Sequence, residues 1–313
     1  MILVGGENLI DFIQDPPDGG HPAYRAVPGG APFNVAKATA LQEVPVGYLT
    51  PFSSDPLGRQ LLADLVKVPN MTALHPGSPR PTSLAVVSLT DGQARYQFYR
   101  EGTAERDVTH EGLAALVPDA AEAFFIGSLA ITDGPDARAW TALYDDLAGR
   151  GIFTALDPNI RAAFIHDRDR YLERLDHLLA GADLVKLSDE DIAWLAPGED
   201  PRAAARRIAA RSSAGLVVLT LGAQGAFAIT ADGEVTVPVH PVRELKDTVG
   251  AGDTFMGTLM AETRRRGKLS RGGLTGLSAA EAAEFLKVAA RAAAINCERS
   301  GCNPPTLAQL QAG

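Results

Sequence analysis

The chain has 313 residues, of which 46% are hydrophobic, enough to bury a large core. Its 38 acidic residues outnumber the 29 basic ones and give a formal net charge of −9. Proteins that bind nucleic acid by neutralising its phosphates usually carry the opposite balance, so we expect no nucleic-acid partner. No apolar run approaches the ~18 residues of a membrane span, and the first residues lack the basic segment of a signal peptide. These features predict a cytoplasmic protein that does not bind membranes.

Apolar runs of strand length alternate with segments of helical period along most of the chain. Strands are predicted at residues 2–4, 46–50, 123–126, 152–156, 184–187, 216–221 and 235–239, and helices at 34–43, 57–68, 136–150, 168–180, 189–196 and 201–211. Such alternation is typical of an α/β fold with a mostly parallel sheet covered by helices on both faces. No linker or repeat divides the chain, so a single domain is expected over residues 1–313.

Two early segments do not fit this alternation. The runs 83–89 and 95–99 flank Asp91-Gly92, a pair typical of a hairpin turn, and residues 11–27 form one extended stretch. We expect these pieces to make a small antiparallel sheet outside the main one. That sheet, built from segments of about 11–30 and 83–103, is a candidate lid.

The segment that suggests chemistry is Gly250-Ala251-Gly252-Asp253, which follows a predicted strand and opens a helix. Small residues here leave the N–H groups of the first helical turn exposed, and together with the helix dipole they form an anion site. A carboxylate beside such a site would repel a bound phosphate. It makes sense if Asp253 removes a proton from a hydroxyl while the amides hold the charge of a phosphoryl group in transfer. The alternative is an ordinary helix N-terminus after a glycine-rich loop.

Two segments near opposite ends of the chain resemble one enzyme family. DTVGAGDTF, beginning at Asp247, resembles the C-terminal signature of the ribokinase-like, or phosphofructokinase B, sugar kinases, and GGAPFNVA, beginning at Gly29, is similar to their N-terminal signature. The similarity runs from Gly6 to Pro304. It implies a three-layer α/β/α fold with a mostly parallel central sheet and a small β-sheet lid. Since two signatures in the right order are more specific than either alone, the ordinary helix N-terminus becomes the weaker interpretation.

The resemblance implies roles for individual residues. Asp253 matches the catalytic base of the family, and the amides of Gly250, Ala251 and Gly252 match its anion hole. The residues that match sugar-binding positions are Asp11, Gly30, Asn34, Arg100 and Arg161. A turn residue at a strand end is the alternative for Asp11, and a surface arginine is the alternative for Arg100. Arg161 could instead hold nucleotide phosphates.

No Gly-x-x-x-x-Gly-Lys-Ser/Thr segment is present, so ATP must be bound without a P-loop. The resemblance implies that the nucleotide is bound by Lys186, Ser188, Thr220, Gly222, Gly225 and Asn296. The loop from Thr220 to Gly225 is equally explained as a turn between two strands.

The resemblance also implies metal ions. Many relatives carry Asn-x-x-Glu, a motif linked to magnesium, where this chain has Ser188 and Asp191. Because Asp191 is shorter than the usual glutamate, Mg²⁺ would be held mainly through water. Asp247 and the carbonyl of Val249 match a site at which relatives bind a monovalent cation such as K⁺.

We therefore expect an ATP-dependent kinase that phosphorylates a primary hydroxyl of a small sugar. Four segments resemble bacterial fructokinases more than ribokinases and favour D-fructose: GENLIDF, FYREGTAERD, DPNIR and KLSDEDIAWL. The alternative within the class is a 2-keto-3-deoxygluconate kinase, and the alternative outside it is a non-catalytic sugar- or nucleotide-binding protein. Relatives also form dimers through the lid, which makes a homodimer one expected assembly, although the sequence shows no decisive interface.

Overall fold

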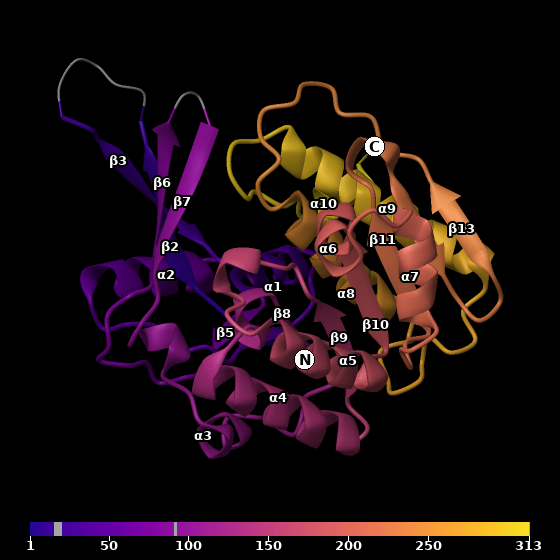
Figure 1. The fold of residues 1–313 in the computed structure, drawn as a ribbon, viewed down its shortest axis with the longest axis horizontal. Helices are drawn as coiled ribbons and strands as arrows, with labels where there is room; N and C mark the ends of the chain where they lie inside the picture. Colours follow the sequence, from indigo (N-terminus) through magenta and orange to yellow (C-terminus); the bar gives the residue numbers. More distant parts are fainter. Residues whose placement is uncertain (16–20, 91–92, 313) are drawn as a thin grey trace.

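The computed structural model describes residues 1–15, 21–90 and 93–312, and it contains two β-sheets (Figure 1). The main sheet has nine strands in the order β13-β12-β11-β10-β9-β8-β1-β4-β5. Their bounds are β1 (Ile2–Val4), β4 (Val46–Tyr48), β5 (Met71–Ala73), β8 (Ala123–Gly127), β9 (Phe153–Asp157), β10 (Leu184–Ser188), β11 (Leu216–Thr220), β12 (Ala226–Ile229) and β13 (Glu234–Val237). Neighbouring strands are parallel except at the β11-β12-β13 edge, which is antiparallel. The mostly parallel main sheet is confirmed.

Helices cover both faces of the main sheet (Figure 1). One face packs against α1 (Ala31–Leu41), α2 (Pro56–Val66), α8 (Ala251–Arg265) and α9 (Ala279–Cys297). The other face packs against α3 (His110–Ala114), α4 (Gly134–Gly149), α5 (Arg168–Gly181), α6 (Asp189–Leu195) and α7 (Pro201–Ala209). The short α10 (Leu307–Gln311) contacts α9. Four 3-10 turns complete the described elements: η1 (Ala104–Arg106), η2 (Ser128–Ile131), η3 (Ala162–Phe164) and η4 (Gly222–Gln224).

The two apolar cores follow from the alternation of side chains along each strand. On β1, Ile2 and Val4 point into the core that contains α1 and α8. Leu3, between them, points into the core that contains α4 and α5. Because both faces of the sheet are buried, its central strands are apolar on both sides, and this produces the continuous apolar runs of the sequence.

The second sheet stands apart from the main one in Figure 1 and has the order β3-β2-β6-β7. Its strands are β2 (Leu9–Gln14), β3 (Tyr24–Gly29), β6 (Leu84–Thr90) and β7 (Gln93–Tyr99). A separate small sheet is therefore confirmed, but the expectation that it is antiparallel is wrong for one pair, since β2 and β6 are parallel. Parallel neighbours require a long crossover, and here the chain passes through the main sheet between them. The predicted turn at Asp91-Gly92 lies outside the described residues.

Some elements differ from those expected. The helix α1 begins at Ala31 rather than at Asn34, because Pro32 in its first turn has no N–H that needs an acceptor. Several elements were not predicted: the short strands β5 and β12, the short helices α3 and α10, and the alanine-rich helix α9, whose small side chains give a weak periodic signal. No helix in the described part of the chain has the length and apolar character to cross a membrane.

Candidate active site

The candidate residues gather at the carboxyl-terminal ends of parallel strands. β9 ends at Asp157, β10 contains Lys186 and ends at Ser188, and β11 ends at Thr220. The N-terminus of α8 also lies at this edge, because a Cβ built on Gly252 would be 3.6 Å from Nζ of Lys186. Open α/β sheets bind ligands at this edge. The topology therefore brings segments from distant parts of the sequence to one place.

The first turn of α8 presents unused backbone N–H groups. Gly250 caps the helix with a φ angle of +72°, and a Cβ at this position would be 2.3 Å from Sγ of Cys302. The amide of Ala251 donates to the carbonyl of Thr248 (3.2 Å). Within the described residues, the amides of Gly250, Gly252 and Asp253 have no acceptor. The available donors thus differ from the expected set, because the Ala251 amide is already used and that of Asp253 is free.

Asp253 lies in the same turn and is only 8% exposed. Its Oδ2 accepts a hydrogen bond from Nδ2 of Asn34 (2.8 Å). Burial raises the pKa of Asp253, while the bond from Asn34 and the positive charges of Lys186 and Arg161 oppose that rise. A buried carboxylate with a raised pKa is a stronger base than one in water, which suits the removal of a proton from a hydroxyl.

Asn34 lies in the first turn of α1, directly after the glycine pair of the N-terminal signature. Gly30 caps α1 with a φ angle of +110°, and a Cβ there would be 2.7 Å from the carbonyl oxygen of Glu7. The side-chain Oδ1 of Asn34 is buried and has no hydrogen-bond partner among the described residues. Since such an atom usually has a partner, this oxygen is available to accept a hydrogen bond from a bound ligand.

Asp11 lies on β2, on the face of the second sheet whose Leu9 and Ala85 pack against Leu129 of η2. The register aligns Asp11 with Ala85, and Ala85 with Phe98, so the three side chains share one face. The ring of Phe98 contacts that of Phe164 in η3 edge-on, with 4.6 Å between centroids. Burial raises the pKa of Asp11 to about 6. A carboxylate so placed can accept hydrogen bonds from hydroxyl groups of a ligand held between the sheets.

Lys186 and Asp157 form a buried ion pair of 2.7 Å. Their side chains are 4% and 2% exposed. Burial raises the pKa of Asp157 to about 6, although the nearby Lys186 lowers it, and the pKa of Lys186 is raised by Asp157, Asp191 and Asp253 against the effect of its burial. The second oxygen of Asp157, Oδ1, has no hydrogen-bond partner in the described chain.

Ser188 and Asp191 form a capping box at the start of α6. Oδ2 of Asp191 accepts from the amide and the hydroxyl of Ser188 (2.8 and 2.7 Å), and Oδ1 accepts from the amide of Ile160 (2.6 Å). Both oxygens that were expected to bind magnesium thus hold the backbone of α6 and of the loop after β9. Arg161, in that loop, is exposed and donates to the carbonyls of Asn159 and Ile160, both at 3.3 Å.

Arg100 directly follows β7 and lies in a buried position rather than on the surface, with 7% of the residue exposed. Nε and one Nη donate to the two carboxylate oxygens of Glu105 (2.7 and 3.2 Å). The guanidinium also lies 5.6 Å from the ring centroid of Phe164. Arg100 lines a cavity of about 460 Å³ together with Phe98 and His166. Its paired state leaves less of the guanidinium for the sugar than the sequence suggested.

The predicted nucleotide loop follows β11, and its two glycines differ. A Cβ on Gly225 would be 2.1 Å from the carbonyl oxygen of Val237, so the packing of the turn requires glycine there. A Cβ on Gly222 would meet no described atom within 4 Å. The hydroxyl of Thr220 donates to the carbonyl of Leu187 (3.3 Å). Of the two glycines, Gly222 is the one whose backbone stays accessible to a ligand.

Asn296, Asp247 and Val249 are linked at the end of α9. The side chain of Asn296 is buried, donates to the carbonyl of Val249 (2.8 Å) and accepts from the amide of Asn303 (2.7 Å). The carboxylate of Asp247 accepts from the amides of Val249 and Gly301 (2.9 and 2.8 Å). Asn296 therefore holds the loop before α8. The expected cation site at Asp247 and Val249 stays a prediction, since each oxygen keeps a second lone pair.

Glu7 is a buried polar residue to which the sequence assigned no role. It is 2% exposed, and its carboxylate accepts from the amides of Ala31 (3.1 Å) and Leu129 (3.2 Å). The signal in the sequence was an acidic residue between the apolar runs 2–4 and 9–10. That pattern shows a buried carboxylate only once the surrounding strands are known.

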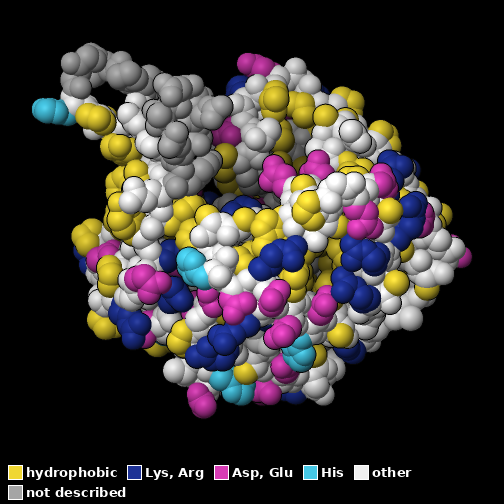
Figure 2. All heavy atoms as spheres, in the orientation of Figure 1, with side chains coloured by type: hydrophobic (Ala, Val, Ile, Leu, Met, Phe, Trp, Pro, Cys, Tyr) yellow, Lys and Arg dark blue, Asp and Glu magenta, His cyan; other side chains and the backbone are white. Residues whose placement is uncertain are grey.

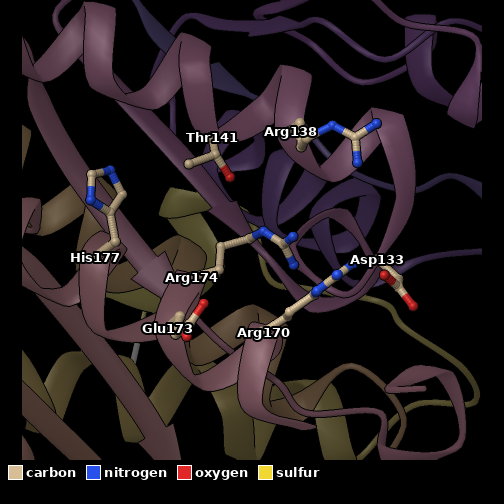
Figure 3. Close-up of a pocket in the computed structure, with 7 residues that line it drawn as sticks. All are labelled: Asp133, Arg138, Thr141, Arg170, Glu173, Arg174 and His177. Carbon is tan, nitrogen blue, oxygen red and sulfur yellow. The ribbon is translucent and has the colours of Figure 1, made fainter. Parts of the chain in front are cut away.

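A groove of about 420 Å³ lies between α4 and α5 (Figure 3). It is lined by Asp133, Arg138, Thr141, Arg170, Glu173, Arg174 and His177. Arg174 donates to the carbonyls of Ile131 and Thr132. In Figure 2 side chains of both charges are interspersed over this face. The lining residues include none of the predicted site residues, and we assign the groove no part in the site.

Comparison with known proteins gives consistent matches along the whole chain. The sequence pattern of the pfkB family carbohydrate kinases matches residues 1–309. A fructokinase of Rhizobium leguminosarum bv. trifolii is 37% identical over 273 residues, which cover 87% of this chain and 82% of that protein. The crystal structure of a fructokinase from Xylella fastidiosa with bound ATP is 26% identical, has a TM-score of 0.85, and covers 99% of this chain and 97% of that one. A fructokinase of Vibrio cholerae O395, solved with fructose, ADP and calcium, is 25% identical, has a TM-score of 0.80, and covers 99% and 96%.

Proposed function

Since the chain belongs to the pfkB family of carbohydrate kinases, we propose that it is a fructokinase, which transfers the γ-phosphoryl group of ATP to a primary hydroxyl of D-fructose. The observation that carries the proposal is the placement of Asp253 beside the free amides that begin α8. The similarity to proteins named fructokinase supports the choice of sugar.

The chemistry that we propose uses a base and an anion hole on one helical turn. Asp253 takes the proton of the attacking hydroxyl, the hydroxyl oxygen bonds to the γ-phosphorus, and the bond from that phosphorus to the bridging oxygen breaks to release ADP. The free amides of Gly250 and Gly252 stabilise the charge of the transferred group. Asn34 keeps the Asp253 carboxylate in place through its 2.8 Å hydrogen bond.

We propose that the sugar lies between the second sheet and the first turn of α1. Within the described part of the chain, the carboxylate of Asp11 and Oδ1 of Asn34 have no hydrogen-bond partner, so both can accept hydrogen bonds from hydroxyls. The backbone of Gly30 approaches the same space. Arg161 contributes positive charge near Asp253. Closure of the second sheet as a lid would keep out water that would otherwise receive the phosphoryl group.

Lys186, Ser188, Thr220, Gly222 and Gly225 are the proposed nucleotide side of the site. Lys186 supports this role best, since its ammonium lies near Gly252 at the anion hole. Gly222 supports it through open backbone, whereas Gly225 and Ser188 contribute by shaping their turns. Asn296 supports the loop that precedes α8.

We propose that Mg²⁺ binds together with the nucleotide. The described residues contain no group of three His, Cys, Asp or Glu side chains that could hold a metal alone. Oδ1 of Asp157 has no hydrogen-bond partner among the described residues and is a fitting oxygen for Mg²⁺ or one of its waters, whereas Oδ2 of Asp191 already accepts two hydrogen bonds and its Oδ1 accepts one. When bound, Mg²⁺ would neutralise charge on the ATP phosphates. A K⁺ site at Asp247 and the Val249 carbonyl belongs to the same proposal.

We propose that two copies of the chain form a homodimer through their second sheets. We also propose that the protein is located in the cytoplasm, where ATP is available. Tyr24 on β3 and Tyr99 on β7 support the dimer, since these edge-strand side chains are 40% and 51% exposed. Sedimentation at several protein concentrations tests the dimer, and a monomer at micromolar concentrations would contradict it.

A panel assay of ADP release tests the proposed function. The acceptors are fructose, ribose, 2-keto-3-deoxygluconate, tagatose 6-phosphate and adenosine, each with Mg·ATP. We expect the largest kcat/KM for fructose. A larger value for 2-keto-3-deoxygluconate would overturn the choice of sugar, although the pairing of Arg100 with Glu105 removes one cation that its carboxylate would need. No turnover with any acceptor, together with measurable sugar binding, would favour a binding protein.

A further inference from the structure

The chain crosses between the main body and the second sheet four times: from β1 to β2, from β3 to α1, from β5 to β6 and from β7 to η1. Two buried glutamates connect these four crossings to one another in pairs. Glu7 lies in the crossing from β1 to β2, and its Oε1 accepts from the amide of Ala31, just after the crossing from β3 to α1. Glu105 accepts from the hydroxyl of Ser83, before β6, and from Arg100, after β7. Side-chain hydrogen bonds therefore hold the second sheet at all four crossings, which together form what we call its root.

Glu7 extends these links to the main sheet. Its Oε2 accepts from the amide of Leu129 in η2, directly after β8 (3.2 Å). Its backbone carbonyl accepts from the hydroxyl of Tyr48 at the end of β4 (2.9 Å). One carboxylate thus fixes the root of the second sheet, the first residue of α1 and the turn η2 relative to one another.

The negative charge of Glu7 is not neutralised by a direct ion pair, because the nearby arginine pairs with another glutamate. The groups that face it are the carboxylate of Glu105 on η1, the guanidinium of Arg100 just after β7, the Ser128 side chain on η2 and the phenol of Tyr48 on β4. The guanidinium of Arg100 donates its hydrogen bonds to Glu105, and Glu7 has no ion pair within the described residues. Burial, followed by the charge of Glu105, raises the pKa of Glu7 to about 7, against the effects of Arg100 and Ser128. An ionised carboxylate in this place lowers stability at neutral pH, so packing alone does not account for it.

We propose that Glu7 is a positioning residue for the phosphoryl transfer: its ionised carboxylate holds the first turn of α1, and through Asn34 the base Asp253, in the reactive arrangement. The inference rests on the proposed kinase function. The path has two hydrogen bonds, from the amide of Ala31 to Glu7 and from Nδ2 of Asn34 to Asp253, joined by one helical turn. A protonated carboxyl has one oxygen that donates, so it cannot accept equally from Ala31 and Leu129. Protonation therefore loosens the link.

The test is Glu7→Gln, which imitates the protonated carboxyl at every pH. We expect kcat/KM for the sugar at pH 8 to fall roughly 10- to 100-fold, because a small displacement of the base is costly, while KM for ATP is unchanged. In the wild type, kcat/KM should decline as the pH falls through about 7, where Glu7 gains its proton. In the variant that decline should begin only near pH 6, where Asp11 titrates.

The matched control is Glu284→Gln, which removes an exposed carboxylate on α9 that pairs with Lys287. It should keep the wild-type rate and pH profile. Equal kcat/KM in wild type and Glu7→Gln at pH 8, or an unchanged profile, would overturn the inference. If the wild type phosphorylates no sugar in the panel, the proposed function fails instead, which is a separate result.

A second measurement on the wild-type protein tests the inference even if the Glu7→Gln variant does not fold. In the wild-type protein with ¹³C-labelled glutamate, NMR titration should show one side-chain carboxyl with a midpoint near pH 7. Fructose binding should move that midpoint downward, since the ionised form holds the first turn of α1, where Asn34 is proposed to bind the sugar. These ¹³C chemical shifts are measured without any turnover of substrate. If fructose leaves every glutamate midpoint in place, the positioning role is contradicted.

Discussion

Four carboxylates lie around the proposed sugar and phosphoryl sites, and each has a raised pKa: the buried Glu7, Asp157 and Asp253 and the half-buried Asp11. Burial is the first cause in every case. Lys186 pairs directly with only one of them, Asp157. Groups whose ionised forms lower stability are common where function needs a base or a hydrogen-bond acceptor. At the level of single residues, the site is therefore organised for ligands rather than for stability.

Asp11→Asn should separate sugar binding from stability. The folded protein raises the pKa of Asp11 to about 6 from 3.8, so it binds the proton more tightly than the unfolded chain. Stability then falls as the pH rises from about 4 through 6, and the neutral Asn side chain removes that loss. We expect the variant to gain about 1–3 kcal/mol at pH 8 and to lose most of its affinity for fructose. Urea unfolding at pH 4.5 and 8, with calorimetric titration of fructose, measures both; a variant less stable at pH 8 with normal affinity contradicts the assignment.

Lys186→Met should be costly because it leaves Asp157 buried without its partner. Removing one partner of a buried pair costs about 3–5 kcal/mol. Asp157 can take up a proton instead, so the loss should be large at pH 8 and smaller at pH 5. Urea unfolding of the single variant and of Lys186→Met with Asp157→Asn gives the comparison. If the double variant is no more stable than the single one at pH 8, the unpaired carboxylate is not the cause.

Individual site residues could be named from the sequence where a signature names them, but their partners could not. Asp253 and Asn34 were assigned separately, and only the fold shows the hydrogen bond between them. Arg100 was expected at the sugar because the sequence does not reveal that Glu105 would take its guanidinium. The network of Glu7 was missed for the same reason, since its donors are amides at residues 31 and 129.

The start of α8 is the element on which the proposed chemistry depends. Its cap at Gly250 has a φ angle that side chains rarely adopt, and Cys302 occupies the space of a Cβ. The amides that remain free are set by this cap, because the Ala251 amide turns back to Thr248. The geometry of one glycine therefore determines which donors face the phosphoryl group.

Gly250→Ala tests this arrangement. The left-handed conformation alone costs an L-residue about 1–2 kcal/mol, and the contact with Cys302 adds to it. We expect a larger loss of stability and a lower kcat with fructose. The control is Gly267→Ala, with a φ angle of +67° and no described atom near the added Cβ, which should show the conformational cost alone and normal kcat. Equal effects of the two substitutions on kcat would contradict the role given to the cap.

At the level of elements, strands with both faces buried were predicted well, since their apolar runs are continuous. β1, β8, β9, β10 and β11 lie within a residue or two of the expected ranges. Alanine-rich α9 and the short β12 were not predicted, because small side chains and short length give little periodic contrast. The parallel pairing of β2 with β6 could not be predicted either, because it depends on where the chain returns after crossing the main sheet.

The whole molecule consists of a main sheet with helices on both faces and a second sheet that is joined to it at the four chain crossings (Figure 1). The second sheet packs against the main body on both faces: Leu9 and Ala85 contact Leu129 on one side, and Ile10, with Phe12, Ala26 and Leu84 beside it, joins the core that contains α2 on the other. These apolar contacts and the hydrogen bonds at the crossings hold it. The net charge of the chain did not indicate that it binds the proposed ATP, because the proposed phosphoryl site uses backbone amides and one lysine within an acidic chain.

The central claim is that Asp253 is the base of an ATP-dependent fructokinase. Asp253→Asn keeps the size of the side chain and an oxygen that can still accept from Asn34. We predict that kcat with fructose falls by roughly 10²- to 10⁴-fold, the usual contribution of a general base. Calorimetric affinities for ATP and fructose and the unfolding temperature should stay close to those of the wild type. A variant that binds both ligands and turns over at a near wild-type rate would contradict the account.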